Sequence, residues 1–284
     1  MTEPFYLDRG GERLAYAWRG GAGPAVVWLG GFRSDMEGTK AQAVDAWAAR
    51  AGRSCLRFDY FGHGRSSGDF LQGTISRWRD DALAVLDALT AGPQILVGSS
   101  MGGWIAMLAA KERPQRVAGL LLIAPASDFT EALMWDQMPE EARCALLQDG
   151  VWQRESADAE ECYPITRTLI EDGRWNLILD EKHALPFPVR ILQGMADTDV
   201  PWPHALKLAG LIDGDVTVTL VKNGDHRLSK PSDLKLLERT LDALLEDVSQ
   251  ESSGPSIEGR GRPRKHGSAF AGRAPNKRTA FGEK

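Results

Sequence analysis

Five consecutive residues, Gly98-Ser99-Ser100-Met101-Gly102, form the pattern Gly-x-Ser-x-Gly. A serine held in a tight turn between two glycines can attack acyl carbonyl groups once a base takes its proton. A helix that starts next to the serine would supply backbone N–H groups and a dipole that favour negative charge. The pattern therefore predicts that Ser100 is the nucleophile of an acyl-transfer reaction.

A base for this serine is expected later in the chain, and His226 is the candidate. It lies in the loop Asn223-Gly224-Asp225-His226, directly after Val216–Val221, whose alternation predicts a strand. The other four histidines have weaker positions, in a short turn, without a strand directly before them, or near the C-terminus: His63, His183, His204 and His266. We therefore expect His226 to take the proton from Ser100.

The third member of such a set is a carboxylate that orients the imidazole. Asp197 follows the predicted strand Val189–Gly194 by three residues and is the first choice. Asp199 is an alternative that could instead cap a helix or a turn. Asp128, after the predicted strand Val117–Ile123, is a second alternative.

Two backbone N–H groups are expected to hold the negative oxygen of the reaction intermediate. The residue after the nucleophile, Met101, supplies one donor, and the loop that follows the third strand supplies the other. That strand is predicted at Ala25–Leu29, and its loop opens with Gly30-Gly31-Phe32. The sequence thus predicts the N–H groups of Phe32 and Met101 as the oxyanion hole.

These residues need a scaffold, and the chain alternates strand-like and helix-like segments, which predicts a mostly parallel sheet flanked by helices. Segments 5–7 and 14–18 predict an antiparallel edge. Apolar residues repeat every three or four positions within 75–89 and 234–248, which predicts amphipathic helices.

A segment of about 57 residues interrupts this alternation. We predict α/β core segments at residues 1–128 and 188–250, a helical cap at 129–187 and a disordered basic tail at 251–284. Some apolar cap residues should face Ser100 and form an acyl pocket. The candidates are Met134, Trp135, Met138, Trp152, Ile170 and Trp175.

Composition is that of a globular enzyme, with 43% hydrophobic residues in a chain of 284. No apolar run approaches the ~18 residues of a membrane span, and the first residues do not resemble a signal peptide. Cys55, Cys144 and Cys162 are scattered, which predicts reduced thiols rather than a disulfide framework or metal site. These features predict a cytoplasmic protein without stable membrane insertion.

The net charge of −5 is unevenly distributed, because residues 255–284 contain eight Lys or Arg and only two Glu. The remaining chain is strongly acidic, which argues against a nucleic-acid partner. The Gly-, Pro- and Arg-rich tail is expected to be a solvated extension, although such tails can also contact anionic surfaces.

The motifs resemble the α/β-hydrolase superfamily and, within it, the abhydrolase-domain-containing 10 group of palmitoyl-protein thioesterases and acyl-glucuronide esterases. The resemblance covers about residues 5–247. It depends on Gly30-Gly31-Phe32, Gly38-Thr39-Lys40, Arg57-Phe58-Asp59-Tyr60, the stretch from Gly92 to Trp104, and Gly194 with Asp197, Val200, Pro201 and Trp202. It implies the same Ser100, Asp197 and His226 roles, although the basic tail and the absence of a transit segment depart from the familiar mitochondrial animal members.

We therefore expect a serine hydrolase that cleaves acyl thioesters or esters through an acyl-enzyme, with no metal or organic cofactor. Its substrate would be a small-molecule or protein-linked acyl compound. A small carboxylesterase or amide hydrolase is the alternative enzyme. A ligand-binding module of the same fold is a third possibility, which turnover of a generic ester would distinguish.

Overall fold

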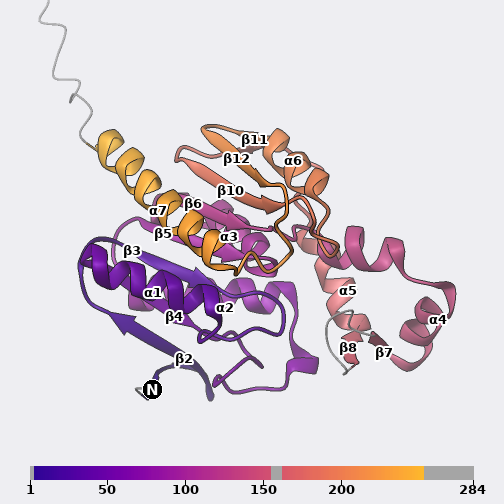
Figure 1. Cartoon of the computed structure of the whole chain (residues 1–284). Coiled ribbons are helices and arrows are strands. Elements are labelled where there is room, and N and C mark those ends of the chain that lie inside the picture. The colour runs from indigo at the N-terminus through magenta and orange to yellow at the C-terminus, as the bar shows by residue number, and fades with distance from the viewer. Residues whose placement is uncertain (1–2, 155–161, 253–284) are drawn as a thin grey trace, which may run out of the picture. The chain divides into compact units, whose positions relative to one another are not determined.

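A computed structural model describes residues 3–154 and 162–252, and its centre is one eight-stranded sheet (Figure 1). The strands lie in the order β1-β2-β4-β3-β5-β6-β10-β12. Their bounds are β1 Phe5–Arg9, β2 Glu12–Arg19, β3 Ala22–Leu29, β4 Arg53–Phe58, β5 Gln94–Ser99, β6 Val117–Ile123, β10 Val189–Gly194 and β12 Val216–Val221. The strands from β4 to β12 pair in parallel, whereas β1 and β2 are antiparallel. The predicted parallel sheet with an antiparallel edge is therefore confirmed.

Helices cover both faces of the sheet because successive strand residues point to opposite sides. In β3, Val26 and Trp28 pack with α1 (Thr39–Ala51) and α7 (Pro231–Ser252). Val27 and Leu29 join the cluster on the other face, which also contains residues of the remaining core helices. Those helices are α2 Ile75–Leu89, α3 Met101–Glu112 and α6 Trp202–Leu211.

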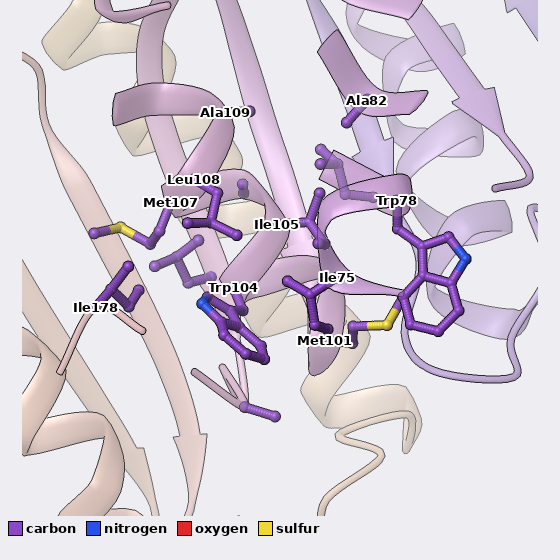
Figure 2. Packing of buried hydrophobic residues seen from close by; sticks show 14 of the residues in the cluster. Ile75, Trp78, Ala82, Met101, Trp104, Ile105, Met107, Leu108, Ala109 and Ile178 are labelled. Atoms are coloured by element: carbon purple, nitrogen blue, oxygen red, sulfur yellow. The ribbon is translucent and has the colours of Figure 1, made fainter. Parts of the chain in front are cut away.

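The helix that follows Ser100 is the most buried helix of the core. Figure 2 shows Met101 and Ile105 of α3 on the side that faces Ile75 and Trp78 of α2, while Trp104 points away from Trp78. All five of these side chains are essentially inaccessible to solvent. Burial of one such side chain stabilises the fold by about 1.5–3 kcal/mol, so α3 and the turn before it are held rigidly.

The chain between β6 and β10 forms a separate group of short elements beside the sheet (Figure 1). They are a π-helix Phe129–Met134, α4 Glu140–Asp149, β7 Val151–Arg154, β8 Tyr163–Thr166, α5 Arg167–Gly173, β9 His183–Ala184 and three-residue turns at 135–137 and 174–176. β7 and β8 pair as an antiparallel hairpin, which the helical apolar spacing did not predict. Beyond β10, β11 Ile212–Asp213 pairs with β9. The remaining three-residue turns are Phe70–Gln72 and Pro114–Arg116.

The insertion is fastened to the core by polar contacts as well as apolar packing. Trp104 of α3 donates its indole N–H to the carbonyl of Asn176, at 2.9 Å. The predicted cap boundaries, 129 and 187, stay a prediction. The predicted tail, 251–284, lies outside the described residues except for its first two residues, which end α7. Among the described helices, none combines the length and apolar character needed to cross a membrane.

Candidate active site

Ser100 lies in a strained turn between β5 and α3. Its backbone has φ 55° and ψ −120°, an unfavourable conformation for a residue with a side chain. Its N–H donates to the carbonyl of Ile123 on the neighbouring strand, at 2.9 Å. A Cβ at Gly98 would lie 2.3 Å from the Gly102 carbonyl oxygen, and one at Gly102 only 2.1 Å from that of Leu29. The two flanking glycines are therefore required by backbone packing, and the Gly-x-Ser-x-Gly pattern has a structural cause.

The structure brings three sequence-predicted residues into one hydrogen-bonded chain. Ser100 Oγ lies 3.0 Å from His226 Nε2, and His226 Nδ1 lies 2.9 Å from Asp197 Oδ2. The three side chains come from the ends of β5, β10 and the loop after β12. His226 is half-buried, while the Asp197 side chain is fully inaccessible. This arrangement can take a proton from the serine and stabilise the resulting imidazolium.

Asp197 is held by more donors than the histidine alone. Its Oδ1 accepts the backbone N–H groups of Asp199 and Val200, at 3.0 and 2.8 Å. Its Oδ2 also accepts from the side-chain amide of Gln193, at 3.0 Å. Gln193 is fully buried in β10, and its amide nitrogen also lies near two backbone carbonyls. Sequence reasoning missed Gln193, although a polar residue near the end of an apolar strand was a usable signal.

The loop that carries His226 is tied to the loop after β10 and to α1. The Ala196 N–H donates to the Gly224 carbonyl, at 2.9 Å, which joins the two loops near Asp197. Lys40 at the start of α1 donates through Nζ to the carbonyl of Arg227. Burial lowers the pKa of Lys40 to about 8, against the nearby negative charge of Asp225. Contacts from both sides thus hold the histidine loop over Ser100.

The predicted oxyanion residues both line the pocket at Ser100. Met101 begins α3, where first-turn N–H groups have no partner within the helix. Next to Phe32, the N–H of Arg33 donates to His63 Nε2, at 3.2 Å, and the other ring nitrogen of His63 lies 3.1 Å from the Phe61 carbonyl. Burial lowers the pKa of His63 to about 4, so His63 stays neutral and can accept. The oxyanion role of Phe32 and Met101 stays a prediction.

A pocket of about 320 Å³ opens at Ser100. Its lining comprises Phe32, Arg33, Ser100, Met101, Ala126, Phe129, Leu133, Met134, Arg154, Tyr163, Asp199, Val200 and His226. Of the six apolar cap residues proposed to face Ser100, this lining includes Met134, whereas Trp175 is 87% exposed. Two arginines, a tyrosine and Asp199 also line the pocket, so its lining is only partly apolar, and the acyl-pocket role of the cap residues stays a prediction.

The alternative acid Asp128 has another partner in the structure. Its buried carboxylate accepts the backbone N–H groups of Ile178 and Leu179, at 2.8–3.1 Å, and so fastens the insertion to the end of β6. Burial raises the pKa of Asp128. Asp199 contributes its N–H to Asp197, while its own side chain is exposed in the pocket. Neither alternative carboxylate is hydrogen-bonded to His226 in the structure.

The lining of the Ser100 pocket includes none of the other described histidines and none of the cysteines. His183 Nε2 lies 2.7 Å from the Ile178 carbonyl, and His204 Nε2 lies 2.7 Å from the Ser127 carbonyl. His266 is outside the described residues. The three cysteines are free; Cys55 is buried, and burial raises the pKa of its thiol to about 12.

One group in the described chain has the residue types of a metal site. Ligand atoms of Asp197, Asp199 and His226 lie within 4.8 Å of one another. Asp197 and His226 already form a hydrogen bond with each other through Nδ1 and Oδ2. The prediction that neither metal nor organic cofactor is needed stays a prediction.

Comparison with known proteins finds similarity to hydrolases. The profile of the family described as "Serine aminopeptidase, S33" matches residues 24–153. The chain is 38% identical to palmitoyl-protein thioesterase ABHD10 of Pongo abelii over 238 residues, covering 83% of this chain and 78% of that protein. The human protein of the same name is 37% identical with the same coverage.

Solved structures give the same result. Alpha/beta hydrolase domain-containing protein 10 from mouse superposes with a TM-score of 0.81 and 36% identity, covering 86% of this chain and 99% of that one. A protein from Agrobacterium vitis S4 superposes with a TM-score of 0.82 and 44% identity, covering 86% and 98%. The predicted α/β-hydrolase fold is therefore confirmed.

These relatives also correct one prediction. The proteins from Pongo abelii, human and Bos taurus are all named as mitochondrial. The predicted cytoplasmic location is therefore wrong by this comparison. It rested on composition and on the first residues of the sequence.

Proposed function

The chain belongs to the ABHD10 group of the α/β-hydrolases and is an enzyme of the serine hydrolase type, and from this premise we propose that it cleaves acyl thioesters or esters through Ser100, His226 and Asp197. The relatives' name points to protein-linked acyl thioesters as one substrate class. A small-molecule acyl ester is the other class that this mechanism accommodates.

The proposed reaction has two halves. His226 Nε2 takes the Ser100 proton while Oγ attacks the acyl carbonyl, and the N–H groups of Phe32 and Met101 hold the oxyanion. The leaving thiol or alcohol departs with the proton from His226. Water, deprotonated by His226, then attacks the acyl-enzyme and releases the carboxylic acid, which regenerates the Ser100 hydroxyl.

The observation that carries this proposal is the continuous contact from Ser100 Oγ to His226 and from His226 to Asp197, at 3.0 and 2.9 Å. Both distances lie within the hydrogen-bonding range expected for a serine and its base. The inaccessible Asp197 carboxylate fixes which imidazole nitrogen faces the serine, because its Oδ2 accepts a hydrogen bond from Nδ1–H and leaves Nε2 free to accept the serine proton.

The apolar part of the pocket supports an acyl substrate. Phe129, Leu133 and Met134 lie in one run of the insertion, and Val200 lies after β10. The volume, about 320 Å³, is at the lower limit of ordinary ligand pockets, ~300–1,000 Å³. We expect each added methylene to raise kcat/KM about fourfold, since its burial is worth about 0.8 kcal/mol, until the pocket is full.

The decisive test is labelling with a fluorophosphonate followed by thioester hydrolysis over a series of acyl lengths. Ser100→Ala should lose labelling and lose turnover by several orders of magnitude, with an unchanged melting temperature. Ser99→Ala is the matched control, because it removes a neighbouring hydroxyl from the same strand end. Equal losses in both variants, or an active Ser100→Ala protein, would refute the assignment.

A peptide amide with the same acyl group separates this proposal from peptidase activity, which the matching family description makes the natural comparison. Thioesters lack most of the resonance that protects an amide, so thioester cleavage should be much faster. Faster cleavage of the peptide, or a profile that peaks at acetyl, would favour the amide or small-ester hydrolase. Ester binding without turnover would favour the ligand-binding module.

A further inference from the structure

Three polar side chains in the Ser100 pocket have no role in the mechanism above. Arg33 follows Phe32 in the loop after β3, Arg154 ends β7, and Tyr163 begins β8. Arg154 and Tyr163 are directly paired across the hairpin, so their side chains lie on the same face. The guanidinium carbon of Arg33 lies 5.0 Å from the centre of the Tyr163 ring. The insertion and the core thus bring two cations and a phenol to one side of the pocket.

The charges of both arginines are uncompensated within the described residues. No carboxylate of residues 3–154 or 162–252 lies within ion-pair distance of Arg33 or Arg154, although many other arginines are paired. Asp199 lines the same pocket but makes no ion pair with either of them. Burial raises the pKa of Tyr163, and the two arginines act against that effect while Asp199 adds to it, so all four groups share one electrostatic environment.

We propose that Arg33, Arg154 and Tyr163 form a subsite for a carboxylate group of the substrate, beside the ester or thioester bond that Ser100 attacks. Planar guanidinium groups match a carboxylate with two parallel N–H donors, and the Tyr163 hydroxyl can add a third. The subsite assigns a substrate class to the proposed hydrolase and so rests on the proposed function. The carboxylate can belong either to the acyl group or to the leaving thiol or alcohol.

Matched thioesters distinguish these two sources. For the leaving group, the pair is S-hexanoyl-3-mercaptopropionate and its methyl ester. For the acyl group, the pair is the mono-thioester of adipic acid and the hexanoyl thioester, both with a neutral thiol. The measurement is kcat/KM from thiol release, and the readout is the ratio of each charged substrate to its neutral partner.

We expect one pair to show a clear preference for the charged substrate. Arg33→Gln and Arg154→Gln should each reduce that ratio by about tenfold, because each removes a hydrogen-bonding charge from a charged ligand. Arg50→Gln is the control: this arginine lies on α1, pairs with Glu238 and is outside the pocket lining, so the ratio should not change. Raising the salt concentration should weaken the preference in the wild-type protein, which tests the subsite without any variant.

The proposal is overturned if neither charged substrate is preferred, or if the preference is unaffected by both substitutions and by salt. Hydrolysis of the neutral thioesters in these cases would leave the proposed function intact. Failure of the proposed function gives a different result, namely no Ser100-dependent cleavage of any of the four substrates.

Discussion

Two buried aspartates follow neighbouring strands of the sheet and do different things. Asp128 comes five residues after β6, and Asp197 three residues after β10. Both are almost inaccessible to solvent, at 5% and 7% exposure. Asp128 binds backbone N–H groups of the insertion, whereas Asp197 binds the imidazole of His226. A buried carboxylate at the correct edge of the sheet is therefore insufficient to identify the acid of the site.

The difference comes from the loop that each aspartate meets. The loop after β12 crosses next to β10, so the chain places His226 within reach of Asp197. The end of β6 is covered instead by residues 178–179, and Asp128 satisfies their amides. The same residue type supports chemistry in one loop and supports architecture in the other.

The sharpest test of this contrast is Asp197→Asn against Asp128→Asn. We expect Asp197→Asn to lower kcat by about 10³–10⁴-fold, because an amide cannot hold the required imidazole tautomer. Asp128→Asn should keep most of the turnover per folded molecule and lower the free energy of unfolding by about 1–3 kcal/mol, since it weakens hydrogen bonds to buried amides. Kinetics with active-site titration and urea unfolding measure the two effects. Comparable losses of kcat in both variants would contradict the assignment of Asp197 to catalysis and Asp128 to stability.

A third loop, after β4, extends the contrast to histidines. His63 is enclosed by the rings of Tyr60, Phe70 and Trp78 and stays neutral, with a pKa of about 4 against about 6.5 when unfolded. Between pH 6.5 and pH 4 the His63 imidazole is protonated in the unfolded chain but neutral in the folded protein. The contribution of His63 to the free energy of unfolding is therefore fully present above pH 6.5 and is lost as pH falls towards 4. The total loss is on the order of 3 kcal/mol.

The measurement for His63 is the difference in unfolding free energy between wild type and His63→Gln. This difference should shrink between pH 7.5 and pH 4.5. The subtraction matters because burial raises the pKa of Asp59 to about 6. Protonation of Asp59 therefore adds to the free energy of unfolding as pH falls through about 6, and this contribution is present in both proteins. A difference that is constant with pH would contradict the neutral, enclosed state of His63.

The support of Asp197 by Gln193 predicts a smaller kinetic effect. Gln193→Met removes one donor from the carboxylate, and we expect kcat to fall about tenfold, as for loss of a hydrogen bond to a charged group. Gln94→Met is a matched control. Gln94 is also buried, lies at the start of β5, at the end away from Ser100, and makes hydrogen bonds only with backbone groups. This substitution should reduce stability without reducing turnover. Similar kcat values for Gln193→Met and wild type would exclude the support role.

The smallest effect is expected on the surface of the insertion. Trp175 is 87% exposed, so Trp175→Ala should change the unfolding free energy by no more than about 0.5 kcal/mol and leave kcat/KM unchanged. Met134→Ala, which enlarges the pocket, should instead weaken the selection for longer acyl chains. An acyl-length profile that changes only in the Trp175 variant would show that the two residues have been assigned the wrong way round.

The sequence by itself determined the local features of this protein. Gly98 and Gly102 mark the turn at Ser100 because backbone atoms leave no room for a Cβ there. Strands and helices follow from hydrophobic spacing within a few residues. For this reason the core strands of the sheet could be predicted, and so could the positions of Ser100, Asp197 and His226 in the loops that follow them.

Tertiary structure decided everything that depends on which distant segments meet. Ser100 and His226 are 126 residues apart in the chain, and the partners of Asp128 lie 50 and 51 residues away. The same holds for the pocket, where Arg33, Arg154 and Tyr163 come together from the core and a hairpin whose apolar spacing predicted helices. Spacing along the chain reports which face of an element is buried, whereas partners across loops are selected by packing and by the need to satisfy buried polar groups.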